Sequence, residues 1–129
     1  MTGFVLDASA LLALLLGEPG GARVGQALTD SAMTTVNFAE VVGHYSRNGG
    51  RDAEIRAILD PLPVSLVPFD HEFAYQVGIL LPVTRAAGLS LADRACLALA
   101  RRLDVPALTA DRAWQAIAEQ AEVRVELIR

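Results

Sequence analysis

Residues 4–16 read FVLDASALLALLL, a short β-type run followed by a helical run that is apolar almost all round. Asp7 stands at the junction of these two runs. A carboxylate between two buried segments is costly unless hydrogen bonds or a cation compensate it. The helical run ends at Gly17 and Pro19, so it is too short to cross a bilayer, which takes about 20 residues. The stretch predicts a buried strand, a buried helix and a carboxylate with a special role.

Strand-like and helical segments alternate through the rest of the chain. Further strands are expected in AMTTV (32–36), VSLVPF (64–69), PALTA (106–110) and VRVELI (123–128). Helices are expected at 20–28, 38–47, 51–60, 70–87 with a break at Pro82, 90–103 and 111–120. This alternation indicates an α/β sandwich around a mainly parallel sheet, built as a single domain over residues 1–129.

Composition narrows the classes of function. The net charge is −4, which argues against a protein that wraps nucleic acid in a basic surface but not against one that handles phosphates through metal ions. All eleven basic residues are arginine, so a catalytic lysine and a Walker A loop are excluded. Cys96 is the only cysteine, so no intrachain disulfide is possible. With no signal-peptide pattern at the N-terminus, a cytoplasmic location is expected.

Four acidic residues stand where helices are expected to begin. They are Asp7, Glu40, Asp93 and Asp111, in VLDAS (5–9), VNFAE (36–40), LSLAD (89–93) and TADRA (109–113). In a βαβ architecture the helices begin at the edge where the strands end. The four acids are therefore expected along the carboxyl edge of the sheet, where open α/β sheets bind their ligands.

Helix capping offers a purely structural explanation for three of these acids. Asn37 with Glu40 and Ser90 with Asp93 both fit the pattern of a capping box. Asp111 fits an ordinary N-cap, and the helix macrodipole favours acids in all these places. Asp7 fits this explanation less well, because it lies between two apolar runs in a chain without lysine.

Convergence of the acids would call for a cation. Carboxylates brought together repel one another, so either some are protonated or a cation is bound. A cluster of carboxylates without His or Cys suits a hard ion such as Mg²⁺ or Mn²⁺. Such ions promote phosphodiester hydrolysis by polarising the phosphoryl oxygen and activating water. The pattern is coherent with a metal-dependent nuclease.

The segments that carry these acids resemble the PIN domain family, and within it the VapC-type toxins of toxin–antitoxin modules. The matching segments are FVLDASALLALLLGEPG (4–20), TTVNFAEVV (34–42), GLSLADRACLALARRLDVPALTADRAW (88–114) and VRVELIR (123–129). They run in the family's order and span nearly the whole chain. The resemblance implies a three-layer α/β/α sandwich with a central parallel sheet of about five strands, which agrees with the alternation of segments.

The resemblance also implies roles for individual residues. Metal binding falls first on Asp7 and Asp93, Glu40 completes an acidic triad, and Asp111 matches a fourth position that varies more in the family. The polar positions that usually line the site, where they orient ligands or a water, are matched by Ser9, Asn37 and Thr109. Mg²⁺ or Mn²⁺ is the expected cofactor.

Other candidate residues have simpler explanations. Arg94 and Arg112 follow two of the acids and are candidates for contacts with RNA phosphate, although a solvated or salt-bridged role is the stronger expectation. His44 is assigned to packing or to the surface. Cys96 reads as a small buried hydrophobe and Trp114 as a core or partner contact.

The resemblance implies a metal-dependent endoribonuclease, the toxin of a type II toxin–antitoxin pair. Its expected partners are RNA, a cognate antitoxin and a second copy in a homodimer, with no membrane. Two alternatives stay open: a PIN-type nuclease in RNA processing or DNA cleavage, and a non-catalytic module whose acids only cap helices. The sequence gives no motif that identifies the RNA target.

Overall fold

A central sheet of five parallel strands organises the computed structural model, which describes residues 2–129. The strands are β1 (Phe4–Leu6), β2 (Ser31–Thr34), β3 (Ser65–Val67), β4 (Ala107–Thr109) and β5 (Val125–Leu127), in the order β3-β2-β1-β4-β5. All five expected strands are present. Pro68 directly follows β3, and β3 is an edge strand, as this proline suggested.

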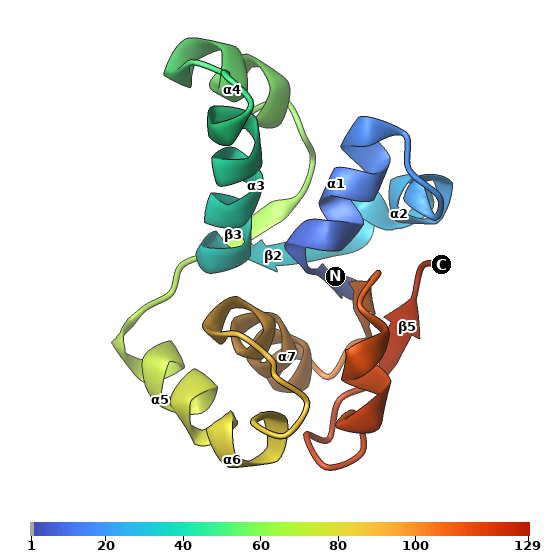
Figure 1. Cartoon of the computed structure of the whole chain (residues 1–129), viewed down its shortest axis with the longest axis vertical. Coiled ribbons are helices and arrows are strands. Elements are labelled where there is room, and N and C mark those ends of the chain that lie inside the picture. Colours follow the sequence, from blue (N-terminus) through green and yellow to red (C-terminus); the bar gives the residue numbers. More distant parts are fainter. Residues whose placement is uncertain (1) are drawn as a thin grey trace.

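Helices cover both faces of the sheet (Figure 1). The α-helices are α1 (Ala8–Leu16), α2 (Gly21–Ala27), α3 (Thr35–Arg47), α4 (Asp52–Leu59), α5 (His71–Ile79), α6 (Leu81–Thr84) and α7 (Leu91–Leu103), with 3₁₀ turns η1 (Leu28–Asp30) and η2 (Arg112–Ala116). In Figure 1, α1 to α4 lie above the sheet and α5 to α7 below it. The expected three-layer α/β/α sandwich is confirmed.

Alternating strand residues feed two separate cores. In β1, Val5 packs with the layer of α5 and α7, whereas Leu6 packs with the layer of α1 to α4. In β4, Ala107 and Leu108 divide in the same way. Successive side chains of a strand point to opposite faces, and both faces are covered here. This double burial explains why the strands read as continuous apolar runs.

The chain reverses its direction of winding between β1 and β4. From β1 it proceeds through α1 to α4 to build β2 and β3 on one side, and then returns through α5 to α7 to add β4 and β5 on the other. This reversal is a topological switch point, and it opens a crevice outside the carboxyl ends of the two central strands. Asp7 directly follows β1, and Thr109 ends β4.

Two helix predictions were wrong in detail. α3 begins at Thr35, three residues before the expected start, because the Thr34 side chain accepts a hydrogen bond from the backbone N–H of Asn37 and caps the helix. The segment 111–120 forms the short 3₁₀ turn η2 and further turns instead of an α-helix. Its buried side chains Trp114 and Ile117 fix it to the core, so tertiary packing outweighs its helical pattern.

Several expectations about individual residues are confirmed. Trp114 and Cys96 are completely buried, and Cys96 is a free thiol. Gly17 ends α1 in a left-handed conformation with φ +68°, which glycine adopts without strain.

Among residues 2–129, no helix combines the length and apolar character needed to cross a bilayer.

Candidate active site

Asp7 is held by three hydrogen bonds at the switch point. Its Oδ1 accepts from the Ser9 hydroxyl at 2.7 Å and from the Ala10 backbone N–H at 2.9 Å, while Oδ2 accepts from the Thr109 hydroxyl at 2.7 Å. The bond to Thr109 crosses from β1 to β4. Asp7 is also the N-cap of α1, so its position follows from the strand-to-helix junction itself.

A further set of bonds fixes the two hydroxyl groups that hold Asp7. The Ala110 backbone N–H donates to Ser9 Oγ at 2.9 Å, and the Asp111 backbone N–H donates to Thr109 Oγ1 at 3.0 Å. Ser9 and Thr109 therefore orient the Asp7 carboxylate and have their own orientation set by the chain after β4. Both side chains thus contact Asp7 directly.

Burial makes the Asp7 charge unfavourable. The residue is only 5% exposed and takes part in no ion pair within residues 2–129. Burial raises the pKa of Asp7 from 3.8 to about 6, and the nearby Asp93 charge adds to this, while the hydrogen bonds from Thr109, Ser9 and Ala10 oppose it. A cation bound beside Asp7 would therefore stabilise its ionised carboxylate.

Glu40 reaches the same region from α3 without capping that helix. The capping box expected for Asn37 and Glu40 is wrong, because Thr34 is the N-cap and Glu40 lies in the second turn. Partial burial and the charge of Asp93 raise the pKa of Glu40, and hydrogen bonding by the Asn37 side chain opposes that rise. Glu40 has no capping duty that would explain its place.

Asn37 lies beneath Glu40 and is 1% exposed. Its Nδ2 donates to the Ala92 carbonyl of α7 at 2.9 Å, and its Oδ1 accepts from the Thr34 hydroxyl at 2.5 Å. Thr34 did not stand out in the sequence. The spacing Thr-x-x-Asn, with the hydroxyl at a strand end, was the available signal for a cap at that position.

Asp93 and Asp111 reach the site as capping residues. The Asp93 Oδ2 accepts from the Ser90 backbone N–H at 2.9 Å while Ser90 Oγ accepts from the Asp93 N–H, so this expected capping box is confirmed. Asp111 Oδ1 accepts from the Ala113 N–H at 2.9 Å, and its side chain is exposed. Each uses one carboxylate oxygen for its cap and keeps the other available.

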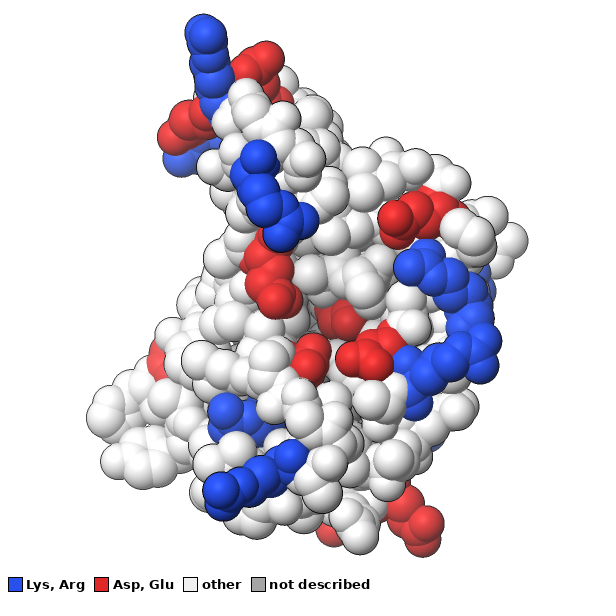
Figure 2. Space-filling view, viewed as in Figure 1, with Lys and Arg blue, Asp and Glu red and all other residues white. Residues whose placement is uncertain are grey.

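Three of the acids influence one another electrostatically. The charge of Asp93 raises the pKa of both Asp7 and Glu40, and all three raise the pKa of the buried Cys96 thiol, for which burial is the main cause. Figure 2 shows acidic side chains gathered near the centre of this face, over the junction of α1, α3 and α7, with basic side chains around them. The carboxyl edge is thus an acidic centre with a basic surround.

The donor set suits a hard divalent cation, although its members are not drawn together. Asp7, Glu40 and Asp93 offer carboxylate oxygens, which Mg²⁺ and Mn²⁺ prefer. Within residues 2–129, no three Asp, Glu, His or Cys side chains lie close enough to hold one ion together. The burial of Asp7, which has no positively charged partner in the described part of the chain, is the observation that fits a cation here.

Two arginines predicted near the acids differ in placement. Arg94 turns from α7 toward α5, where its guanidinium donates to the Val77 carbonyl at 3.4 Å. Arg112 is exposed at the start of η2, directly after Asp111. Arg112 stays available to a ligand at the carboxyl edge, whereas Arg94 is committed to packing between helices.

Comparison with protein families gives one match over most of the chain. The model of the PIN domain family matches residues 4–120. A comparison with curated proteins found no significant match.

Solved structures share the fold across the whole chain at low sequence identity. A DNA-bound VapBC from Salmonella typhimurium has a TM-score of 0.77 and 12% identity and covers 100% of both chains. A toxin–antitoxin complex from Klebsiella pneumoniae has a TM-score of 0.74 and 16% identity, with 98% of each chain covered. VapBC-5 from Mycobacterium tuberculosis has a TM-score of 0.64 and 23% identity, covering 100% of this chain and 99% of that one.

Proposed function

The chain belongs to the PIN domain family of nucleases, and from that premise we propose that it is a metal-dependent endoribonuclease acting as the toxin of a type II toxin–antitoxin pair. The observation that carries the proposal is Asp7, a buried carboxylate at the switch point with a raised pKa and no ion-pair partner within residues 2–129. The switch point of the fold lies at the same edge of the sheet as Asp7, which supports the proposal.

The residues that would hold Mg²⁺ or Mn²⁺ are Asp7, Asp93 and Glu40, with Asp111 as a fourth contributor, and their carboxylates would have to draw together around the ion. A bound divalent ion neutralises charge that develops on the phosphoryl oxygens and helps to activate water near neutral pH. Ser9 and Thr109 keep the Asp7 carboxylate in one orientation through their hydrogen bonds.

Glu40 is our candidate for the proton acceptor. Burial and the charge of Asp93 raise its pKa, which makes its carboxylate a stronger base, and the side chain has no structural duty as a cap. In this role one Glu40 oxygen receives the proton of the attacking water. The expected products carry 5′-phosphate and 3′-hydroxyl ends.

RNA capture falls on arginines around the acids. Arg47 lies two turns after Glu40 on α3, and Arg112 follows Asp111; both are exposed, and neither forms an ion pair within residues 2–129. Guanidinium groups on both sides of an acidic centre would hold the phosphates that flank the cleaved bond. This arrangement reconciles an acidic chain with a polyanionic substrate.

A cognate antitoxin is the proposed protein partner. The structural relatives include toxin–antitoxin complexes from several bacteria. On this chain, α3 and α4 border a hollow of about 320 Å³ whose apolar lining includes Phe38, Val42 and Leu59. A helical segment of the antitoxin would bury its apolar face there. Copurification with the protein encoded immediately upstream would test this partner.

A homodimer through α5 is proposed as the assembly. Tyr75 and Ile79 are 61% and 70% exposed, and they border a hollow over Ala74 and Gly78. One helix face thus carries both projections and a recess, which is the requirement for a two-fold contact. Antiparallel pairing would also bring Glu72 near the start of one α5 toward Arg85 beyond the end of the other.

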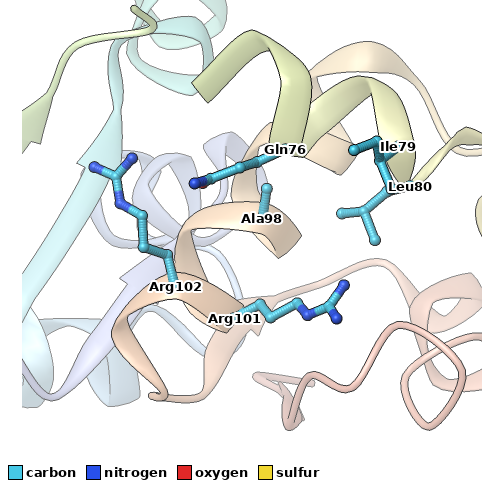
Figure 3. Close-up of a pocket in the computed structure, with 6 residues that line it drawn as sticks. All are labelled: Gln76, Ile79, Leu80, Ala98, Arg101 and Arg102. Carbon is cyan, nitrogen blue, oxygen red and sulfur yellow. The ribbon is translucent and has the colours of Figure 1, made fainter. Parts of the chain in front are cut away.

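A neighbouring hollow widens this surface. Figure 3 shows Gln76 and Ile79 of α5, with Leu80 just after it, facing Arg101 and Arg102 of α7 across a hollow of about 440 Å³. It lies between the two helices rather than at the acids.

Measurement of the molecular mass by light scattering, with Ile79→Asp as the disrupting variant, tests the dimer: the wild type should be dimeric and the variant monomeric.

A non-catalytic binding module is the competing function, since Asp7, Asp93 and Asp111 do cap helices. The deciding experiment incubates labelled total RNA with the purified, antitoxin-free chain in Mg²⁺, in Mn²⁺ and in EDTA. Cleavage that requires metal supports the nuclease and reveals the RNA class. Absence of cleavage together with absence of calorimetric metal binding would leave the binding module; cleavage of DNA alone would support the other nuclease alternative.

A further inference from the structure

A short chain of hydrogen bonds joins the two helical layers beneath the acids. Thr34 at the end of β2 donates its hydroxyl proton to Asn37 Oδ1 at 2.5 Å and accepts from the Asn37 backbone N–H at 3.0 Å. Asn37 Nδ2 then donates to the Ala92 carbonyl of α7 at 2.9 Å. Among the described residues, this last bond is the only hydrogen bond between α3 and α7.

The chain ends on the peptide unit that carries an acid. The Ala92 carbonyl belongs to the same rigid peptide plane as the Asp93 nitrogen. On α3, Glu40 follows Asn37 by three residues, which places both on the same side of the helix. One side chain therefore connects the backbone of Asp93 with the helical turn that presents Glu40.

Burial leaves the two polar side chains no substitute partner. Thr34 is 0% exposed and Asn37 is 1% exposed, so a broken bond could not be replaced by bulk water. The Asn37 amide is engaged on both its oxygen and its nitrogen. These two bonds give the Asn37 amide a structural role in joining the layers, whatever its second N–H donates to.

We infer that Thr34 and Asn37 are positioning residues that fix Glu40 of one layer relative to Asp93 of the other. This inference rests on the proposed nuclease function for its importance, but the bond that carries it belongs to the fold. In this role neither residue needs to contact a phosphate or an ion. They act through the relative placement of α3 and the first turn of α7.

The test compares Asn37→Ala and Thr34→Val with Thr34→Ser and with a matched control, Ser31→Ala. Ser31 starts the same strand that Thr34 ends, is 2% exposed, and donates its hydroxyl to the Ala27 carbonyl at 2.8 Å. Its loss removes a buried hydrogen bond of the same kind away from the acids. Thr34→Ser keeps the hydroxyl and should restore wild-type behaviour.

Two readouts decide the inference. The first is Mn²⁺ affinity by calorimetry: Asn37→Ala and Thr34→Val should weaken binding by about 10-fold, the low end of losses from residues that orient metal ligands. Thr34→Ser and Ser31→Ala should stay within about two-fold, which is below the losses typical of such residues. In a Glu40→Gln background, the effect of Asn37→Ala should shrink, because the acid it positions is already lost.

The second readout needs no metal. Hydrogen exchange of the backbone amides in the first turn of α7 should accelerate in Asn37→Ala but not in Ser31→Ala. Unchanged exchange there would overturn the inference whatever the metal does. A wild type that binds no Mn²⁺, yet shows the exchange effect, would instead remove the proposed function and keep the connection between the helices.

Discussion

The two edges of the sheet treat buried polar groups differently. At the carboxyl edge, four buried polar residues bond to partners in other elements or turns: Asp7, Thr34, Asn37 and Thr109. At the amino edge, the buried hydroxyl of Ser31 bonds to the Ala27 carbonyl four residues earlier. The polar groups of the carboxyl edge connect β1 with β4 and α3 with α7, whereas the Ser31 hydrogen bond stabilises only the turn that precedes its own strand.

This difference distinguishes buried polar groups that stabilise the fold from buried polar groups that suit a ligand. A locally satisfied hydroxyl costs little, because its hydrogen bond replaces one to water. A buried carboxylate without a cation costs more, as the raised pKa of Asp7 indicates. The carboxyl edge therefore gives up stability that the amino edge keeps, and a cation would recover it.

The largest expected effect is on catalysis at the carboxyl edge. Asp7→Asn or Asp93→Asn should reduce metal-dependent RNA cleavage by at least about 100-fold, since each removes a charge that the divalent ion requires. Circular dichroism should show an intact fold in both. Ser31→Ala is the control and should cleave at the wild-type rate; full activity in both Asn variants would remove the site assignment.

Replacing Glu40 should separate chemistry from stability. Glu40→Gln is expected to lower kcat by about 10- to 100-fold, the range of a general base, while leaving the midpoint of thermal unfolding close to that of the wild type. Glu40 caps no helix, so the fold does not depend on it. Single-turnover cleavage measures the rate, and an unchanged kcat would show that another group accepts the proton.

The pH dependence of stability should reveal the buried charge. The folded chain binds the Asp7 proton more tightly than the unfolded chain, because burial raises its pKa from 3.8 to about 6. Stability in EDTA should therefore fall as the pH rises through that window, by about 3 kcal/mol from this group.

Urea titrations across that pH range measure this loss. Asp7→Asn lacks the titrating group, so its free energy of unfolding should decline less than that of the wild type. Parallel curves for the two proteins would show that Asp7 is not perturbed in the folded chain.

The smallest expected effect concerns a cap. Ser90→Ala and Asp70→Ala each remove an N-cap, of α7 and α5 respectively, and each should cost about 1 kcal/mol of stability. Only Ser90→Ala should also weaken Mn²⁺ binding, because the Ser90 hydroxyl accepts from the Asp93 backbone N–H and so fixes the turn that presents this acid. Equal Mn²⁺ affinity in both variants would show that this cap does not orient Asp93.

Local signals made much of this architecture predictable from the sequence. Apolar runs located the five strands, and the Ser90–Asp93 spacing located the start of α7. The segment 111–120 misled because its helical pattern is overridden by the anchoring of Trp114 and Ile117 in the core. At α3, either Thr34 or Asn37 could have been the N-cap. Thr34 is the cap in the structure, because β2 ends there and the helix begins at the next residue.

The hydrogen bonds within the candidate site could not be predicted from local sequence patterns. The bond from Thr109 to Asp7 spans 102 residues, and the bond from Asn37 to Ala92 spans 55. Helix starts placed the acids along one edge, but only the folded chain assigns the partners of each oxygen. Glu40 shows this clearly, since a capping box fits its sequence while its structure lacks one.

The measurement that tests the central claim most directly is thermal unfolding of wild type and Asp7→Asn at pH 7.5, in EDTA and in excess Mn²⁺. If Asp7 is kept for a cation, the variant should be the more stable protein in EDTA, because it removes a buried charge. Mn²⁺ should then raise the melting temperature of the wild type and leave that of the variant unchanged. A variant less stable than the wild type in EDTA, with neither protein responding to Mn²⁺, would contradict the claim and leave Asp7 as a structural cap.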